Sequence, residues 1–381
     1  MDFSLTEDQK MLKTMVRDFA ETEVEPIAAQ IDEEARFPVE TIKKAAKLGL
    51  MGAGFPEDYG GSGGGAIEQA IIFEEIARVC ASTSVILIAT NELSGYPIYK
   101  YGNEAQKQRF LVPIANGEKL ACFALTEASA GSDVAALETT ATRQNNGYIL
   151  NGTKLFITNG NEADILVVFA TCDKSLGYRG IASFIVEKGT PGFSVGKLEH
   201  KLGIRASSTA ELLFENCFVP EANRLGEEGK GFRIALETID ASRIGIGAQA
   251  VGIAQGAFDK SLTYAKDRQQ FGQPIANFQA IQWMLADMAT QIDAARLLTY
   301  RAAYLKDKGL PFTKEASMAK VFAAETAMSV TTKAIQIYGG YGYIKDYPLE
   351  RYFRDAKITE IYEGTSEMQR MTIARNLIRE S

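Results

Sequence analysis

The chain has 381 residues, 46% hydrophobic and 23% charged, which is typical of a soluble globular enzyme with two or three domains. Its net charge of -7 excludes nucleic acid as the main partner, because phosphate binding needs a basic surface. Four scattered cysteines and a single histidine exclude a disulfide framework, a metal site rich in His or Cys, and a Ser-His-Asp enzyme. We expect the one histidine, His200, in a surface strand or loop.

The N-terminal residues and the distribution of apolar residues bear on where the protein is found. The first residues are acidic and lack an apolar run, so we expect no signal peptide. No stretch reaches ~18 uninterrupted apolar residues, which predicts no membrane span. We therefore expect a cytoplasmic protein without membrane contacts.

The first ~120 residues have helical patterning. Thr6 and Gln9 have the spacing of a capping box, and apolar residues then recur at helical intervals. Further helices are predicted from Pro38 to the glycines at 49–52, over 66–79, and across 85–101.

The pattern changes to short strands near Leu120. Two strands, 148–150 and 154–158, flank Asn151-Gly152, a dipeptide that favours a hairpin turn. More strands are predicted at 165–170, 181–186 and 212–218. This part is expected to be a small antiparallel β domain, a sandwich or a barrel.

Helical patterning returns near Gly231 and continues to the end. The segments 232–265, 277–307, 314–338 and 366–379 are long enough for a bundle of antiparallel helices. Small residues are frequent over 240–257, which indicates that a neighbour packs close to that backbone. Ser366 and Gln369 have capping-box spacing at the start of the last helix.

The order of the elements argues against a nucleotide-binding α/β fold, because no strand–helix–strand alternation is present. Gly245 to Ala250 matches the dinucleotide fingerprint as a string, but it lies inside a predicted helix with no strand before it. We predict an α+β fold with a helical domain at 1–120, an antiparallel β domain at 121–228 and a C-terminal four-helix bundle at 229–381.

Without metal ligands, acid–base chemistry falls to carboxylates, lysines or tyrosines. Glu363 lies between Tyr362 and Gly364, three residues before a predicted helix N-cap, on a connection between two helical segments. A carboxylate there could reach over a cleft while the helix stays fixed. From the spacing alone, a solvated loop glutamate is an equal alternative.

Five motifs in chain order resemble the acyl-CoA dehydrogenase family, and the resemblance covers essentially the whole chain. Tyr362-Glu-Gly-Thr365 is similar to the family segment whose Glu is the catalytic base. The other four are Phe123 to Asp133, Phe156 to Gly160, Asp267 to Gly272, and Gln336 to Gly342. The helix–β–helix layout of the family also matches the layout predicted above.

The resemblance implies FAD-dependent α,β-dehydrogenation of an acyl-CoA thioester. Glu363 would remove the α-proton, its N–H would stabilise the thioester oxygen, and apolar neighbours would raise its pKa toward working pH. The flavin would accept the β-hydrogen as hydride.

The resemblance also assigns binding residues. Flavin contacts are expected from Phe123, Leu125, Thr126, Phe156, Thr158, Gln336, Gly340, Thr365 and Glu367. The FAD of a neighbouring subunit is expected to meet Arg268, Gln270 and Phe271, and the substrate to meet Ser132, Asp240, Arg243, Asn91, Tyr362 and Gly364. A surface charge for Arg268 and an ion pair within the bundle for Arg243 are the alternatives.

The acyl group is expected to meet the helix at about 85–96. No Arg lies there, so a dicarboxylic substrate is not expected. Asn91 with an intact Glu363 suits a short, butyryl-like chain, or alternatively a cyclohexane- or cyclohexene-carboxyl thioester. Asn91 and Glu92 could instead face solvent or a subunit contact.

The family further implies a homotetramer that passes electrons to an electron-transferring flavoprotein. An acyl-CoA oxidase of the same fold is the nearest alternative, although the compact chain favours a dehydrogenase. A catalytically silent helical scaffold is the alternative from another class, and the intact Glu363 argues against it.

Overall fold

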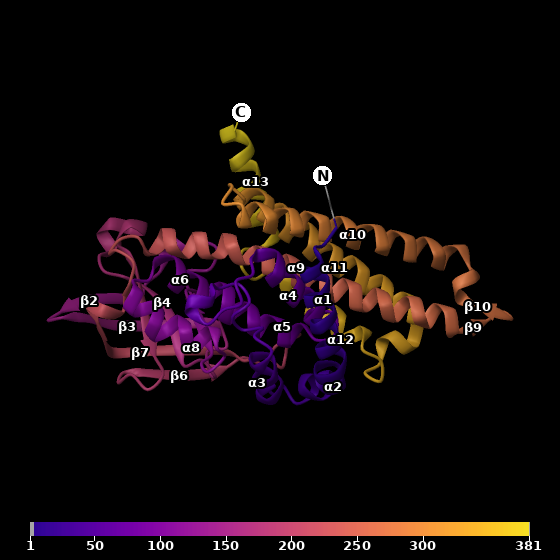
Figure 1. Ribbon diagram of the computed structural model, residues 1–381, viewed down its shortest axis with the longest axis horizontal. Helices are drawn as coiled ribbons and strands as arrows, with labels where there is room; N and C mark the ends of the chain where they lie inside the picture. The colour runs from indigo at the N-terminus through magenta and orange to yellow at the C-terminus, as the bar shows by residue number, and fades with distance from the viewer. Residues whose placement is uncertain (1–3, 381) are drawn as a thin grey trace.

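The computed structural model describes residues 4–380, in which a helical part, a β domain and a helical bundle follow one another. The predicted α+β class and the three-part order are confirmed. The longest helix, α9 (Gly231–Asp267), is joined to α10 (Gln279–Asp307) through the short strands β9 (Gln269–Gln270) and β10 (Gln273–Pro274). Figure 1 shows the β domain at one end of an elongated molecule and this β9–β10 tip at the other.

The N-terminal part consists of short helices around a buried pair, α4 (Ala66–Ala77) and α5 (Ala81–Ile88). The capping box of Thr6 and Gln9 is present. The other helices are α1 (Glu7–Phe19), α2 (Glu25–Glu33), α3 (Val39–Lys47), α6 (Tyr96–Tyr101), α7 (Glu104–Gln106) and α8 (Val112–Ala115).

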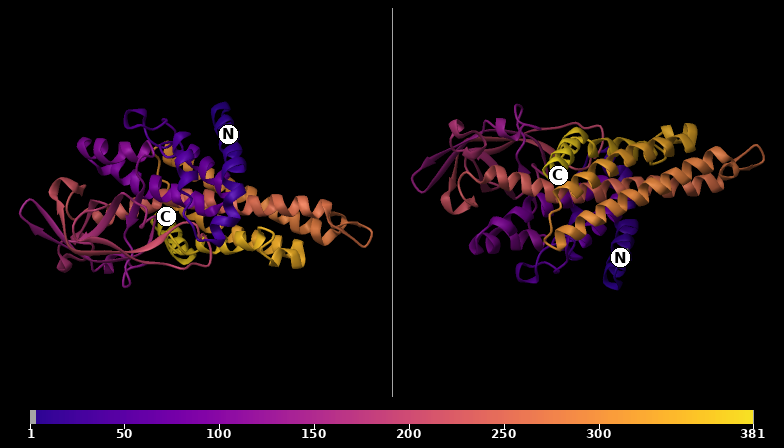
Figure 2. Two further views of the ribbon diagram at one scale, coloured as in Figure 1. Left: turned by 90° about the horizontal axis from the view of Figure 1, so that it is seen from below. Right: turned by 90° about the horizontal axis from the view of Figure 1, so that it is seen from above.

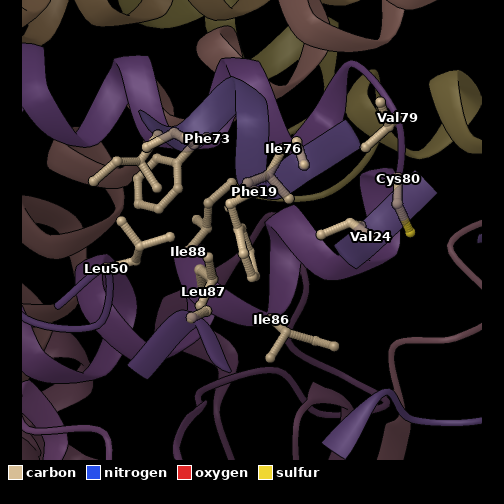
Figure 3. Packing of buried hydrophobic residues seen from close by; sticks show 14 of the residues in the cluster. Phe19, Val24, Leu50, Phe73, Ile76, Val79, Cys80, Ile86, Leu87 and Ile88 are labelled. Atoms are coloured by element: carbon tan, nitrogen blue, oxygen red, sulfur yellow. The ribbon is translucent and has the colours of Figure 1, made fainter. Parts of the chain in front are cut away.

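Helices α4 and α5 are buried along nearly their whole length in the core of this part. Phe73 of α4 and Leu87 and Ile88 of α5 pack with Phe19 of α1 and Leu50, and none of the five is more than 5% exposed (Figure 3). The predicted helix across 85–101 is therefore a core element, but the π-helical segment η3 (Ala89–Gly95) interrupts it.

The middle part is an eight-stranded sheet in the order β6-β7-β3-β2-β4-β5-β8, with β1 beside β4. Most pairs are antiparallel, as predicted, but β1 and β2 both run parallel to β4. The strands are β1 (Ala121–Ala124), β2 (Thr140–Gln144), β3 (Gly147–Thr158), β4 (Ile165–Thr171), β5 (Ile181–Glu187), β6 (Phe193–Leu198), β7 (Thr209–Pro220) and β8 (Arg224–Leu225).

The predicted hairpin at Asn151-Gly152 is wrong, because both residues lie inside the single strand β3. The turn comes earlier, at Asn145 and Asn146, where Asn145 has a φ of 50°. Asn tolerates this left-handed conformation, so either Asn-containing pair could have supplied the turn. Near Gly152 the pairing of β3 with β7 shifts register, as at a β-bulge.

Strand β4 is buried on both faces, since alternate side chains enter two different cores. Ile165, Val167 and Phe169 pack toward the helices, whereas Leu166 and Val168 pack among the strands. A strand covered on both sides reads as a continuous apolar run, which is the pattern of this segment.

The C-terminal part is a bundle of α9, α10, α11 (Thr313–Tyr338) and α13 (Ser366–Glu380). Helix α9 packs against both α10 and α11, and Figure 2 shows these long helices lying side by side. A fifth helix that the sequence reading missed, α12 (Leu349–Thr359), packs on α11 and α9.

The small residues of α9 allow close approach to its neighbours, as predicted. A Cβ at Gly252 would lie 2.3 Å from the carbonyl oxygen of Glu74, and one at Gly256 would lie 2.0 Å from that of Arg78. The fingerprint-like string 245–250 lies within this helix, so its interpretation as helix packing is confirmed. Among the helices of residues 4–380, none is long and apolar enough to cross a bilayer.

The predicted capping box at Ser366 is wrong. The hydroxyl of Thr365, one residue earlier, accepts a hydrogen bond from the N–H of Met368 at 3.4 Å, so Thr365 is the capping residue. The side chain of Gln369 instead donates to the carbonyls of Glu363 and Gly364. His200 lies in an exposed loop, as expected.

Candidate active site

Glu363 lies on the connection between α12 and α13 in a left-handed backbone conformation, with a φ of 53°. Such a conformation is uncommon for residues other than Gly and persists only where the surroundings hold it. The Gln369 side chain donates to the Glu363 carbonyl at 3.2 Å and to the Gly364 carbonyl at 2.7 Å. Lys320 of α11 donates to the same Gly364 carbonyl at 2.7 Å. The loop is therefore fixed at its carbonyls.

The Glu363 side chain points to α9, where the Ser242 hydroxyl donates a hydrogen bond to its carboxylate. Burial raises the pKa of this carboxyl to about 7, although the Ser242 hydrogen bond and the cations Lys320 and Arg243 favour the anion. Within residues 4–380, no acceptor takes the Glu363 N–H, so this donor remains available to a ligand. A base with a pKa near 7 can gain and lose a proton at working pH.

Tyr362 fixes the loop from the other side. Its hydroxyl donates to the Gln249 side chain of α9, and the Gln249 amide donates to the Ala81 carbonyl at 2.9 Å. Burial raises the pKa of Tyr362 well above its usual value, so the phenol stays neutral. Gln249, which the sequence reading missed, thus joins α9, α5 and the Glu363 loop.

The predicted CoA contacts fall into two groups. Asp240 and Arg243 of α9 form a 2.6 Å ion pair, and Arg243 also donates to the Glu363 carbonyl at 3.3 Å. The alternative expectation, that Arg243 forms an ion pair within the bundle, is therefore confirmed. Arg243 also holds the Glu363 loop in position. Ser132 is separate from this pair, on an exposed loop of the β domain.

The residues expected beside the flavin ring come together in the β domain. The loop after β1 meets β3 where Leu155 N–H donates to the Thr126 carbonyl at 2.8 Å. Phe156 has a φ of 58° and is 61% exposed, which leaves its ring open to a ligand. Phe123, Leu125 and Thr126 lie on β1 and the following loop, and Thr158 ends β3.

Two buried polar groups that the sequence reading missed hold this region. The Lys154 ammonium, 0% exposed at its side chain, contacts the Glu127 carboxylate at 2.6 Å and so joins β3 to the loop after β1. The Asn159 amide donates to the Ile86 carbonyl at 3.0 Å, which links the end of β3 to α5. A Lys or Asn in a β-rich sequence gives no signal of such burial.

The second set of expected FAD contacts lies at the far end of α9. Arg268 follows α9, 26 residues after Ser242, which corresponds to about 39 Å along a helix. Arg268 lies 5.5 Å from the ring of Tyr341, and Phe271 is 92% exposed at the tip. Tyr341 lies with Gly340 in the 3-10 segment η9 (Gly339–Tyr343), which follows Gln336 of α11. Gln270 lies on β9. Thr365 and Glu367, in contrast, adjoin the Glu363 loop.

Asn91 and Glu92 lie in η3, and each is only 1% exposed. The expectation that they face solvent or a subunit contact is therefore wrong. Asn91 donates to the Leu50 carbonyl at 3.2 Å. Whether Asn91 meets the substrate stays a prediction.

Comparison with known proteins shows to which family the chain belongs. The N-terminal, middle and C-terminal domains of acyl-CoA dehydrogenase match residues 6–118, 122–217 and 229–378. The chain belongs to the acyl-CoA dehydrogenase family. The family resemblance and the three-domain fold expected from the sequence are thereby confirmed.

Two curated family members match along the whole chain. A short-chain specific acyl-CoA dehydrogenase of Clostridium acetobutylicum is 54% identical, with 100% of both chains covered. An acryloyl-CoA reductase (NADH) of Anaerotignum propionicum is 55% identical, covering 100% of this chain and 96% of the relative.

Two solved structures also match over 100% of both chains. Butyryl-CoA dehydrogenase of Megasphaera elsdenii is 48% identical with a TM-score of 0.98. A chain from a structure of the electron transferring flavoprotein of Acidaminococcus fermentans, described in connection with flavin-based electron bifurcation, is 52% identical with a TM-score of 0.99.

Members of the acyl-CoA dehydrogenase family are flavoproteins, and the residues of this chain fit the flavin. Phe156 presents an exposed ring, Phe123 is half-buried, and the Thr126 and Thr158 side chains, also half-buried, add hydroxyl groups. An aromatic surface edged by hydrogen-bonding groups suits a planar heterocycle that carries polar atoms. Among residues 4–380, no group of three or more His, Cys, Asp or Glu could hold a metal ion.

Proposed function

We propose that this acyl-CoA dehydrogenase removes two hydrogens from the α and β carbons of a short-chain acyl-CoA. The observation that carries the proposal is the Glu363 carboxyl, with a pKa of about 7, hydrogen-bonded to Ser242 on a loop that Gln369, Lys320 and Arg243 fix. FAD, when bound, supplies the two-electron redox chemistry that side chains lack.

Glu363 acts as the base for the α-proton. An α-proton beside a thioester is only weakly acidic, so the negative charge that develops on the thioester oxygen must be stabilised. The Glu363 N–H, which no acceptor within residues 4–380 takes, belongs to the same residue as the base and would donate to that oxygen. The left-handed backbone of Glu363 and Gly364, with φ values of 53° and 91°, sets the direction of this N–H relative to the side chain.

The binding roles follow the groups described above. Phe123, Leu125, Thr126, Phe156 and Thr158 are proposed to hold the isoalloxazine of the same subunit, with Thr365 and Glu367. Ser132, Asp240 and Arg243 are proposed for the CoA moiety, and Tyr362, Gly364 and Asn91 for the acyl thioester. Of these, Arg243 is 7% exposed and already paired with Asp240, so its contribution runs mainly through the Glu363 loop.

The assembly is proposed to be a homotetramer in which each FAD meets two subunits. Arg268 lies about 39 Å along α9 from Ser242, too far to share one cofactor with it inside one chain. Arg268, Gln270 and Phe271 would therefore contact the FAD of a neighbour, Arg268 through its pyrophosphate. Gln336 and Gly340, expected from the resemblance beside Thr365 and Glu367, precede the Tyr341 ring that Arg268 contacts and are proposed for the same neighbouring FAD. The exposed rings of Phe271 and Trp283, 92% and 65% exposed, are apolar surface that such an assembly would cover.

The substrate class and the electron acceptor rest on the named relatives. Both the curated dehydrogenase and the solved butyryl-CoA dehydrogenase are named for short acyl chains. None of the four proteins cited above is named for an alicyclic thioester or an oxidase. An electron-transferring flavoprotein is proposed as the acceptor, in line with the structure from Acidaminococcus fermentans.

The reverse reaction is a second candidate because the reductase of Anaerotignum propionicum is 55% identical. A carboxyl with a pKa of about 7 is partly protonated at neutral pH, so Glu363 can also donate a proton to the α-carbon.

Anaerobic mixing of the purified yellow protein with acyl-CoA thioesters tests the proposal. Butyryl-CoA should bleach the flavin fully and yield crotonyl-CoA, faster than octanoyl-CoA or cyclohexanecarboxyl-CoA. Crotonyl-CoA added to the dithionite-reduced protein tests the reverse direction. Bleaching by none of these thioesters would contradict the proposed function.

A further inference from the structure

Glu92 is a buried carboxyl that no described residue hydrogen-bonds. It is 1% exposed, and neither carboxylate oxygen has a hydrogen-bond partner within residues 4–380. The nearest cation is Lys306 of α10, with 3.8 Å between its ammonium and Oε1. An unsatisfied buried carboxyl is costly unless water or a ligand meets it.

The position of Glu92 relates it to the catalytic base. A Cβ at Gly245 would lie 2.1 Å from Glu92 Oε2, so this carboxyl occupies the space that a side chain would fill. Gly245 follows Ser242, the partner of Glu363, by three residues. Such positions lie on one face of a helix and differ by about 4.5 Å in height along its axis. The two carboxyls therefore meet the same face of α9 in consecutive turns. Glu363 also adds to the repulsion that Glu92 experiences.

Lys306 lies between the Glu92 carboxyl and the protein surface. Its ammonium lies 4.9 Å from the centre of the Tyr96 ring. Lys306 and Tyr96 line a surface cavity of about 680 Å³, together with Phe55, Gln69 and Phe312. The Glu92–Lys306 pair thus stands between the catalytic carboxyl and this surface cavity.

We propose that Glu92 and Lys306 form a polar end wall that the distal carbons of the acyl group meet, and that this wall restricts the enzyme to short acyl chains. The inference rests on the proposed function, since it assigns the distal end of the substrate of Glu363. A four-carbon acyl group leaves room for water to hydrogen-bond the Glu92 carboxyl. A longer chain must displace that water and bury methylenes against a carboxyl and an ammonium.

The wall makes chain-length selection depend on pH. Three groups face Glu92: Lys306 from α10, Glu363 from its loop and the Gly245 backbone from α9. Burial raises the pKa of Glu92 to about 8, against the attraction of Lys306. The carboxyl is thus mainly neutral at pH 7 and mainly anionic at pH 9. Because desolvating an anion costs more than desolvating a neutral acid, long chains are penalised more at pH 9.

The experiment compares kcat/KM for hexanoyl-CoA and butyryl-CoA between pH 7 and 9 with the FAD-loaded wild type, Glu92→Gln and Glu92→Leu. Both substrates require deprotonated Glu363, so the titration of Glu363 cancels when the two kcat/KM values are divided. The hexanoyl-to-butyryl ratio of wild type should fall by about threefold or more across this range. It should stay flat in Glu92→Gln, which keeps the shape but cannot ionise. In Glu92→Leu it should rise by about tenfold or more, the scale of discrimination by single methylenes.

Glu75→Gln is the matched control, because Glu75 is also a 1% exposed carboxyl but pairs with Lys13, Arg17 and Arg78 away from this face of α9. Its ratio should follow wild type. If Glu92→Leu does not retain FAD, the wild type and Glu92→Gln profiles decide. A wild type ratio that does not change with pH, or one that changes equally in Glu92→Gln, would overturn the end wall. A wild type that butyryl-CoA does not reduce would refute the proposed function itself.

Discussion

Removing the Ser242 hydroxyl should move the pH dependence of the reaction. Ser242 is fully buried and donates to the Glu363 carboxylate, a hydrogen bond that favours the anion and so opposes the effect of burial. Ser242→Ala removes this support and should raise the pKa of Glu363 above its present value of about 7. A hydrogen bond to a charged group contributes about 1.5–3 kcal/mol, which corresponds to on the order of one to two pH units.

The sign of the change can be followed in the rate of flavin reduction. Glu363 must be deprotonated to accept the α-proton, so the rate rises as pH passes through its pKa. In Ser242→Ala the rise should occur about one to two pH units higher, with a rate at pH 7 about five- to fiftyfold below wild type and recovery near pH 9. Stopped-flow reduction by butyryl-CoA between pH 6 and 9.5 measures both profiles.

Ser261→Ala is the matched control, because Ser261 is also buried on α9 but its hydroxyl donates to the Ala257 carbonyl at 2.8 Å. Its profile should coincide with that of wild type. An unshifted profile in Ser242→Ala, or an equal shift in Ser261→Ala, would refute the role of Ser242.

Two further predictions concern the stability of the fold. Gly256→Ala should lower the free energy of unfolding by about 1–3 kcal/mol, since its Cβ would lie 2.0 Å from the Arg78 carbonyl oxygen. Gly131→Ala is the control and should leave the free energy of unfolding unchanged, because the space around its Cβ is open. Equal denaturant midpoints for the two variants would contradict the packing argument. Lys154→Met should cost about 3–5 kcal/mol and weaken FAD retention, because the buried Glu127 carboxylate loses its cation and keeps only the N–H groups of Glu138 and Thr139. Denaturant titration and flavin content measure this loss, and a variant as stable and as yellow as wild type would contradict it.

The sequence predicted the order of the three parts because periodicity and composition change sharply near residues 120 and 231. The positions of individual turns and helix caps do not follow from these patterns. Asn145-Asn146 and Asn151-Gly152 both suit a turn, and only the pairing of β3 with β7 along its length makes the second pair part of a strand. The Ser366 and Gln369 spacing does not produce a capping box, because the Gln369 side chain donates to the loop carbonyls of Glu363 and Gly364 instead of bonding the helix end.

The base could be located from sequence, but its surroundings could not. Glu363 was found through the motif at 362–365, whereas Ser242, Gln249 and Lys320 come from helices 43 to 121 residues away in the chain. Glu92 was grouped with Asn91 as a candidate surface residue, since a charged side chain inside a helix usually faces solvent. Its burial follows from the close packing of η3 on Gly245, which periodicity alone does not show.

The central claim is that Glu363 is the base, and Glu363→Gln tests it most directly. The substitution keeps the size of the side chain and the backbone N–H but removes the group that accepts the proton. Anaerobic reduction of the flavin by butyryl-CoA should slow by more than the ~10²–10⁴ typical of losing a general base, because no second base lies within reach of the same carbon in the proposed arrangement. FAD content and acyl-CoA binding should persist. A variant that keeps its FAD and retains more than about a tenth of the wild type rate would contradict the assignment.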